Sequence, residues 1–167
     1  MTAESERDDL VEALGAHRRF LLFTVQGLSD DQARLAPTVS ALTLGGLIKH
    51  VARMEQQWAD FVLDGPETMA MTEARMAAHA DSFVLRDDET LAGVVAEYED
   101  TARRTDELVR GLPDLDASQP LPEAPWFPPG ARRSARRVFV HLIAETAQHA
   151  GHADIIRETI DGQKSMG

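Results

Sequence analysis

Four long segments in which apolar residues recur at steps of three and four constrain the fold of this chain more than any other feature. In the first segment, Leu14, Leu21 and Leu28 recur every seven residues, which is typical of helices that pack in a bundle. The four segments cover residues 4–28, 44–63, 88–112 and 134–160. At 1.5 Å per residue, the four segments predict helices of about 30–40 Å.

The segments between these helices predict where the chain turns. Thr43 is a predicted N-cap, and Asp-Gly-Pro at 64–66 is a helix stop. Residues 67–86 leave two readings open, a short helix across the bundle or an irregular crossover. Six of the eight prolines fall in 113–133, which predicts a long irregular connection because proline inside a helix removes a backbone hydrogen bond.

These elements predict an all-α protein, an antiparallel four-helix bundle with long crossover connections. No alternating run of β-branched residues is long enough to form a sheet. We expect a single domain over residues 1–167, because one domain usually comprises about 100–200 residues. Trp126 and Phe127 are expected to dock the proline-rich connection on the bundle.

Composition excludes several classes of function. The 17 basic and 28 acidic residues give a formal net charge of −11, which disfavours nucleic acid and anionic membranes as partners. No apolar run approaches the roughly 18 residues of a membrane span, and the acidic start lacks the apolar core of a secretion signal. The chain has no cysteine, which excludes disulfides, thiolate metal sites and cysteine nucleophiles. We expect a cytoplasmic protein.

The last predicted helix carries four ionisable residues where a bundle helix normally places leucine or isoleucine. They are His141, Glu145, His149 and His152. At about 100° per residue, Glu145 and His149 differ by about 40° around the helix, and His149 and His152 by about 60°. Side chains three and four residues apart are neighbours on one face. These groups can therefore converge on one point.

A divalent cation is the simplest partner for a buried carboxylate and buried imidazoles, because an unpaired buried charge is costly. His50 lies in the apolar stripe of the second predicted helix and is the candidate ligand from a facing helix. Gly45 and Gly46, one turn earlier, allow another backbone to approach closely. A set of His50, Glu145 and His149 leaves an open position, as in catalytic zinc sites. No second glutamate-histidine pair is present, so one metal is expected rather than two.

The residues alone also permit a hydrogen-bonded polar network or a solvated face in place of a metal site. His152 is a candidate ligand, a group that orients Glu145, or part of the pocket lining, and it is the candidate catalytic proton shuttle. His141 is expected to orient a ligand. His17 is expected to be a hydrogen-bonded core residue, and no function is expected of His79.

Four arginines cluster at the start of the last predicted helix, namely Arg132, Arg133, Arg136 and Arg137. Helix N-termini favour acidic residues, so this cluster does not serve the helix dipole. We expect these arginines to be solvated or to pair with surface carboxylates. Arg136 is the candidate for binding an anionic group of a cofactor or substrate.

Two segments resemble the DinB/YfiT-like metal-dependent four-helix bundles. They are Leu47–Trp58 and Ser134–Gly162, and the second contains the motif His-Ala-Gly-His-Ala-Asp at 149–154. Within this family the chain is similar to the mycothiol-dependent transferase and maleylpyruvate isomerase group. The resemblance implies a metal triad whose members fall on His50, Glu145 and His149.

The resemblance further implies a metal-dependent, thiol-dependent S-transferase. A divalent metal, zinc first and nickel, iron or manganese as alternatives, would convert a low-molecular-weight thiol such as mycothiol to its thiolate, which attacks a small electrophile. The absence of cysteine agrees with a diffusible thiol. A non-catalytic metal-binding stress-response protein and a metal-dependent hydrolase stay open. Because relatives often pair through bundle faces, the resemblance allows a homodimer, which the sequence itself does not show.

Overall fold

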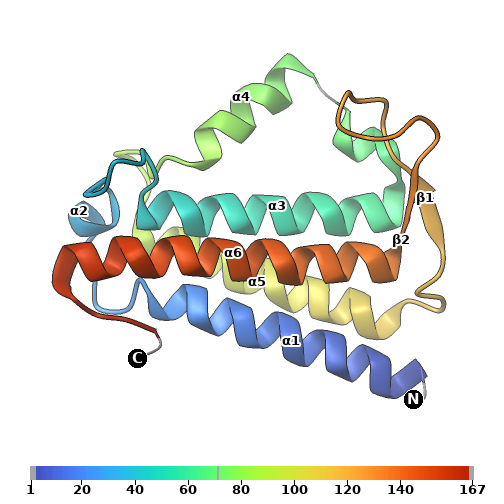
Figure 1. Cartoon of the computed structure of the whole chain (residues 1–167), viewed down its shortest axis with the longest axis horizontal. Helices are drawn as coiled ribbons and strands as arrows, with labels where there is room; N and C mark the ends of the chain where they lie inside the picture. The colour runs from blue at the N-terminus through green and yellow to red at the C-terminus, as the bar shows by residue number, and fades with distance from the viewer. Residues whose placement is uncertain (1–2, 71, 166–167) are drawn as a thin grey trace.

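Four helices of 21 to 27 residues lie side by side and form the body of the protein (Figure 1). The computed structural model describes residues 3–70 and 72–165. Its elements are α1 (Ala3–Phe23), α2 (Asp30–Ala33), α3 (Leu44–Asp64), the 3₁₀ helix η1 (Pro66–Met69), α4 (Glu73–Ser82), α5 (Leu91–Gly111), β1 (Ser118–Pro120), β2 (Arg132–Ser134) and α6 (Ala135–Asp161). The predicted all-α bundle is confirmed. The expected domain of residues 1–167 extends beyond the described residues at both ends and stays a prediction.

The connections set the directions of the four helices. α1 leads through α2 into α3, which runs the opposite way (Figure 1). The crossover through η1 and α4 carries the chain back along the bundle, so α3 and α5 run in the same direction, and α6 returns beside α1. α4 stands above α3 at an angle and is not one of the four packed helices. Of the two readings for 67–86, the short helix is correct.

Two helix ends differ from the sequence prediction. α1 ends at Phe23 rather than near residue 28. The reason is that Arg157 of α6 donates to the backbone carbonyls of Thr24 and Gln26 at 2.8 and 2.9 Å. α5 begins at Leu91 rather than near 88, because the hydroxyl of Thr90 accepts from a backbone amide and is the N-cap. The predicted cap at Thr43 is confirmed.

The glycine pair at the start of α3 permits the close approach that the sequence predicts. A Cβ atom on Gly46 would lie 1.9 Å from the carbonyl oxygen of Phe83, and one on Gly45 would lie 2.7 Å from the side chain of Leu85. Any larger residue would force the loop after α4 away from α3. The two glycines therefore fix where residues 83–85 cross α3.

The proline-rich connection contains a short antiparallel ribbon, so the expectation of no sheet is wrong. Ser118 pairs with Ser134 and Pro120 with Arg132, in strands of three residues each. Strands this short leave no alternating pattern in the sequence. The ribbon joins the connection to the start of α6.

The apolar core divides into two clusters along the length of the bundle. One contains Leu142 of α6 and Trp58 of α3, and the other contains Ala150 of α6 and Val51 of α3. Glu145 and His149 fall between the α6 residues of these two clusters in the sequence. Among the described helices, none combines the length and apolar character needed to cross a membrane.

Candidate functional site

A cavity of about 730 Å³ lies where α3, α4, α6 and the proline-rich connection meet. Its lining includes His50, His79, Ser82, Trp126, His141 and Glu145. Ligand pockets usually measure about 300–1,000 Å³. The space is therefore large enough for a small organic molecule, and several ionisable side chains face it.

His50 is held by a hydrogen bond that determines which of its ring nitrogens is free. His50 as a whole is 7% exposed, and its Nδ1 lies 2.9 Å from the Oγ of Ser82. The Ser82 hydroxyl donates its proton to the carbonyl oxygen of His79 at 2.6 Å, because a carbonyl can only accept. Ser82 Oγ therefore accepts from the Nδ1–H of His50. The Nε2 of a neutral His50 is left with a free lone pair, which suits metal binding or proton acceptance.

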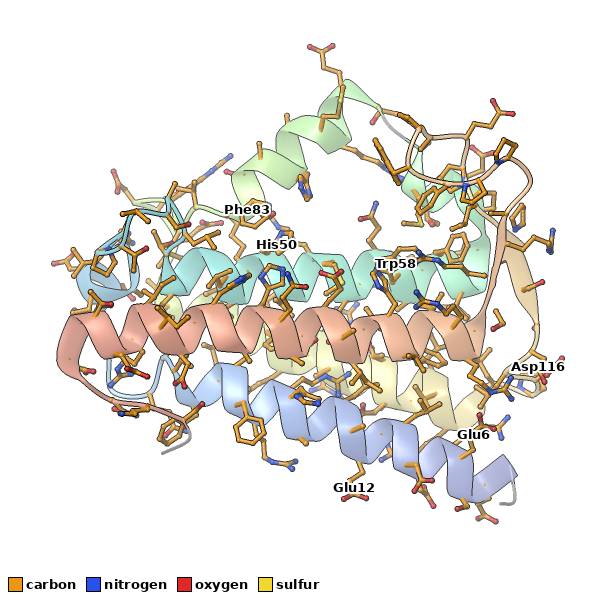
Figure 2. The ribbon with its side chains drawn as sticks, viewed as in Figure 1. Glu6, Glu12, His50, Trp58, Phe83 and Asp116 are labelled. Carbon is orange, nitrogen blue, oxygen red and sulfur yellow. The ribbon has the colours of Figure 1, made fainter. Side chains whose placement is uncertain are left out.

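Aromatic rings and imidazoles surround His50, as Figure 2 shows for Phe83. The ring of Phe83 stacks on His50 at 3.9 Å between centroids, and the rings of His149 and His79 lie at 5.0 and 5.4 Å. Burial lowers the pKa of His50 to about 4, and the neighbouring histidines act in the same direction. His50 is thus neutral at physiological pH.

Glu145 lies between two histidines on consecutive turns of α6. Its carboxylate oxygens are 3.8 Å from the Nδ1 of His141 and 3.8 Å from the Nε2 of His149, which is too long for a hydrogen bond. Burial lowers the pKa of both histidines. The charge of Glu145 acts against this lowering in both, and the carboxylate forms an ion pair with either histidine only when that ring is protonated.

His149 and His152 carry buried nitrogens without partners. The Nδ1 atom of each is inaccessible to solvent and has no hydrogen-bond partner in the part of the chain that the structure describes. Their rings lie 5.6 Å apart. Leaving a buried polar atom unpaired costs about 1–3 kcal/mol, and a catalytic role or a bound ion is among the explanations for such an atom.

These residues fit a divalent cation in chemistry but do not yet surround one. Neutral imidazoles and a carboxylate are the donors that zinc and similar ions prefer, and the free nitrogens of His50 and His149 are available to such an ion. Within residues 3–70 and 72–165, however, no three histidine, cysteine, aspartate or glutamate side chains are arranged to hold a metal ion. Binding would require the side chains of His50, Glu145 and His149 to draw together.

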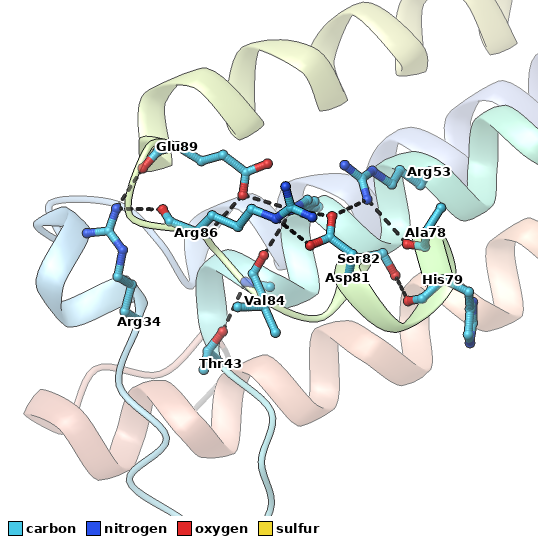
Figure 3. Close-up of polar contacts among 12 residues, drawn as sticks. Arg34, Thr43, Arg53, Ala78, His79, Asp81, Ser82, Val84, Arg86 and Glu89 are labelled. Atoms are coloured by element: carbon cyan, nitrogen blue, oxygen red, sulfur yellow. Dashed lines mark hydrogen bonds and ion pairs between the residues drawn. The ribbon is translucent and has the colours of Figure 1, made fainter. Parts of the chain in front are cut away.

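A buried lysine ties the end of α4 to α3, in the polar network that Figure 3 shows around Asp81 and Arg86. Lys49 is 1% exposed, and its Nζ donates to Asp81 at 3.1 Å, to Glu89 at 2.8 Å and to the carbonyl of Val84 at 3.0 Å. The lysine thus bridges three points of the loop and helix that cross α3. This pairing offsets the cost of burying its charge.

Asp81 is the centre of the same network. Besides Lys49, its carboxylate accepts from Arg53 at 3.0 Å and from Arg86 at 2.6 Å. These donors hold the pKa of Asp81 well below its usual range. Because Ser82 follows directly in the chain, the network also places the hydroxyl that orients His50.

The structure brings most of the predicted site residues together. His50, Glu145, His149 and His152 form one group, although only His50 and Glu145 of these are among the residues that line the cavity. Arg136 is elsewhere: its guanidinium pairs with Glu6 and Asp116, which lie at the far end of the bundle from His50 (Figure 2). The geometry therefore gives no support to its predicted role.

Sequence reasoning missed Ser82 and Phe83, and expected no function for His79. All three belong to the region 67–86, where periodicity is weak, and they reach His50 only through the fold. In the sequence, the glycine pair at 45–46 was the one indication of these contacts, because it predicted that another backbone passes close to His50. His17, expected in the core, is half-buried on α1 against Phe20.

The four-helix arrangement, with histidine and glutamate on facing helices beside a cavity, defines a DinB-like helical bundle. The family model described as mycothiol-S-transferase matches residues 9–162. The chain belongs to the mycothiol S-transferase family. A search of curated proteins finds no match.

Proposed function

We propose that this protein is a metal-dependent S-transferase that joins a low-molecular-weight thiol of the mycothiol type to a small electrophile. The observation that carries the proposal is the cavity of about 730 Å³ lined by His50 and Glu145 in a chain of the mycothiol S-transferase family. The chain has no cysteine, so the reacting sulfur must come from a diffusible thiol.

His50, Glu145 and His149 would hold the divalent cation, zinc first among the candidates. The free Nε2 of His50 and the unpartnered nitrogen of His149 support this assignment. A bound cation of this kind supplies Lewis acidity, which favours the thiolate form of a thiol near neutral pH. The carboxylate of Glu145 would lower the net positive charge of the site.

In the proposed reaction the thiol loses its S–H proton and a carbon–sulfur bond forms at the electrophilic carbon. With a chloronitrobenzene as the test electrophile, the carbon–chlorine bond breaks and chloride leaves with the bonding electron pair. His152 is the proposed proton acceptor. Its buried Nδ1 has no partner, and its ring lies beside His149.

The test is thiol-dependent turnover of 1-chloro-2,4-dinitrobenzene by the purified protein supplied with zinc. We expect turnover with mycothiol that depends on both the thiol and the metal. Tight zinc binding without turnover with any thiol would favour a non-catalytic metal-binding protein. Metal-dependent cleavage of a chromogenic ester without thiol would favour a hydrolase. Absence of zinc binding would overturn the proposed site. The cytoplasmic location and the homodimer stay predictions.

A further inference from the structure

One arginine at the start of α6 differs from its neighbours in what surrounds its charge. Arg132 donates to Ser118, Arg136 pairs with two carboxylates, and Arg137 is exposed. The guanidinium of Arg133 instead lies 4.7 Å from the ring centroid of Trp58. The second aromatic contact of Arg133 is with Phe127, at 5.4 Å.

Among the described residues, no carboxylate lies at ion-pair distance from Arg133, although the charge of Glu145 acts to raise the pKa of its guanidinium and that of Arg137 to lower it. The Nη1 atom of Arg133 is buried without a hydrogen-bond partner, and burial lowers the pKa of the group. Within the described residues, Arg133 makes no ion pair, whereas the buried cations Lys49, Arg18 and Arg157 all contact carboxylates. Because burying an unpaired charge is costly, this guanidinium is equipped to receive an anion that is not part of the chain.

Arg133 does not itself line the cavity that contains His50 and Glu145, but it stacks on a residue that does. Trp58, on which it stacks, lines that cavity. Trp126, which also lines it, packs against Phe127 with ring centroids 6.1 Å apart. The guanidinium is thus one aromatic ring away from the space that holds the proposed reactants.

We propose that Arg133 binds a carboxylate group of the electrophilic substrate, so that the enzyme selects small electrophiles that carry an anion. This inference rests on the proposed function and specifies its substrate class. Aromatic rings stack on the face of a guanidinium, which leaves the in-plane N–H groups for an acceptor. A carboxylate matches them because its two oxygens lie in one plane and accept two parallel hydrogen bonds. On a chain of net charge −11, an unpaired arginine gives an anionic substrate a specific point of attraction.

The test compares two unreactive ligands that differ only in the carboxylate, 3,5-dinitrobenzoate and 1,3-dinitrobenzene. Binding to the full-length protein is measured by titration calorimetry or by quenching of tryptophan fluorescence. We expect the wild type to bind the benzoate about 10-fold or more tightly than the neutral ring, as a charge-assisted hydrogen bond predicts. Arg133→Gln should abolish this preference while changing the affinity for 1,3-dinitrobenzene less than about twofold. Arg133→Lys should retain part of it.

Arg19→Gln is the matched control, because Arg19 is exposed on α1 and its loss changes the net charge equally. The preference should survive in this variant. Equal binding of the two ligands by the wild type would overturn the proposal, and so would a preference that survives Arg133→Gln. A loss of affinity for both ligands alike would show that Arg133 only packs the connection. If saturating mycothiol displaces the benzoate competitively, the anion site serves the thiol, and the assignment to the electrophile is wrong.

Turnover separates this inference from the proposed function. The reactive pair is 4-chloro-3,5-dinitrobenzoate and 1-chloro-2,6-dinitrobenzene, again differing only in the carboxylate. If the enzyme uses the anion, the benzoate has the lower KM, and Arg133→Gln raises that KM without a matching effect on the neutral substrate. If neither compound reacts with any thiol but the benzoate still binds through Arg133, the proposed function fails while the anion site stands.

Discussion

Two polar clusters lie inside the same bundle, one closed and one open. In the closed cluster, Arg18 of α1 donates to Glu55 of α3 at 2.6 and 3.2 Å and to Asp106 of α5 at 2.7 Å. In the open cluster, the Nδ1 atoms of His149 and His152 have no hydrogen-bond partner among the described residues. Both interrupt an apolar interior, but only the first satisfies its own charges. The completeness of pairing therefore distinguishes a structural network from a site that awaits a ligand.

α3 contributes to both clusters from opposite sides. His50 and Glu55 are five residues apart, which separates them by about 140° around the helix. α3 is buried all round in its first part, where residues 44–52 are all buried. One helix can thus hold α1 and α5 together through Glu55 and present His50 to the cavity under α4.

Glu55→Leu tests the closed cluster and should have the largest effect on stability. It leaves the buried Arg18 without its main partner, which typically costs about 3–5 kcal/mol. The measurement is the free energy of unfolding in urea. Arg18→Met combined with Glu55→Leu should cost much less than Glu55→Leu alone, because neither charge remains. Equal losses in the single and the double variant would contradict a closed, mutually satisfied pair.

His149→Ala tests the open cluster and should affect binding more than stability. The affinity for zinc should fall by at least about 10–100-fold, the range reached even by groups that only orient ligands. Competition with a chelator measures the affinity. The metal-free variant should unfold in urea within about 1 kcal/mol of the wild type, because His149 Nδ1 has no partner to leave unsatisfied. His17→Ala, on α1, is the control and should retain full zinc affinity. Unchanged affinity in His149→Ala would remove His149 from the site.

Ser82→Ala removes the hydrogen-bond partner of His50 in the open cluster and leaves the proposed metal ligands unchanged, which sharpens the comparison. The Nδ1–H of His50 would lose its acceptor, so the ring would be less well oriented. We expect zinc affinity to fall by about 10-fold. Thr105→Val is a matched control, because Thr105 is also buried and its hydroxyl donates to a backbone carbonyl, but it lies on α5. A similar loss in both variants would indicate a general loss of stability.

The Lys49–Asp81–Glu89 network should give the smallest effect, visible as a dependence of stability on pH. The pKa values of Asp81 and Glu89 are lowered in the folded protein. Their contribution to stability is therefore present above the unfolded-state pKa of about 4 and is lost as the pH falls below it. The measurement is the free energy of unfolding in urea between about pH 5 and about pH 2. It should fall less steeply with decreasing pH in Asp81→Asn than in the wild type.

Arg86→Gln should have an intermediate decline, because it removes one of the donors that lower the pKa of Asp81. Identical slopes in all three proteins would show that the network does not stabilise the fold through its charges. In that case the position of α4 over the open cluster would depend on the contacts of Phe83 and Leu85 with α3.

Local patterns predicted much of the fold and part of the site. The spacing of apolar residues predicted all four long helices. Thr43 was identified as an N-cap because it directly precedes the second of them. The face shared by Glu145 and His149 followed from helical geometry, since residues four apart are always neighbours. Membership of the mycothiol S-transferase family agrees with the resemblance seen in the segments around His50 and His149.

The surroundings of His50 could not be predicted in this way. Ser82 and Phe83 reach it because Lys49 and Asp81 hold α4 on α3, and these contacts join residues more than 30 positions apart. A local pattern carries no information about such partners.

The sequence by itself determined which ionisable residues share one face of a helix, because helical period and residue type depend only on neighbours along the chain. Only the tertiary structure decided which of these residues find a hydrogen-bond or ion-pair partner. Arg133 and Arg136 are one turn apart and chemically identical, yet Arg136 pairs with Glu6, 130 residues away, while Arg133 stacks on aromatic rings and makes no ion pair within the described residues. Whether a charge finds a counter-ion depends on the approach of distant segments, and only folding sets that approach.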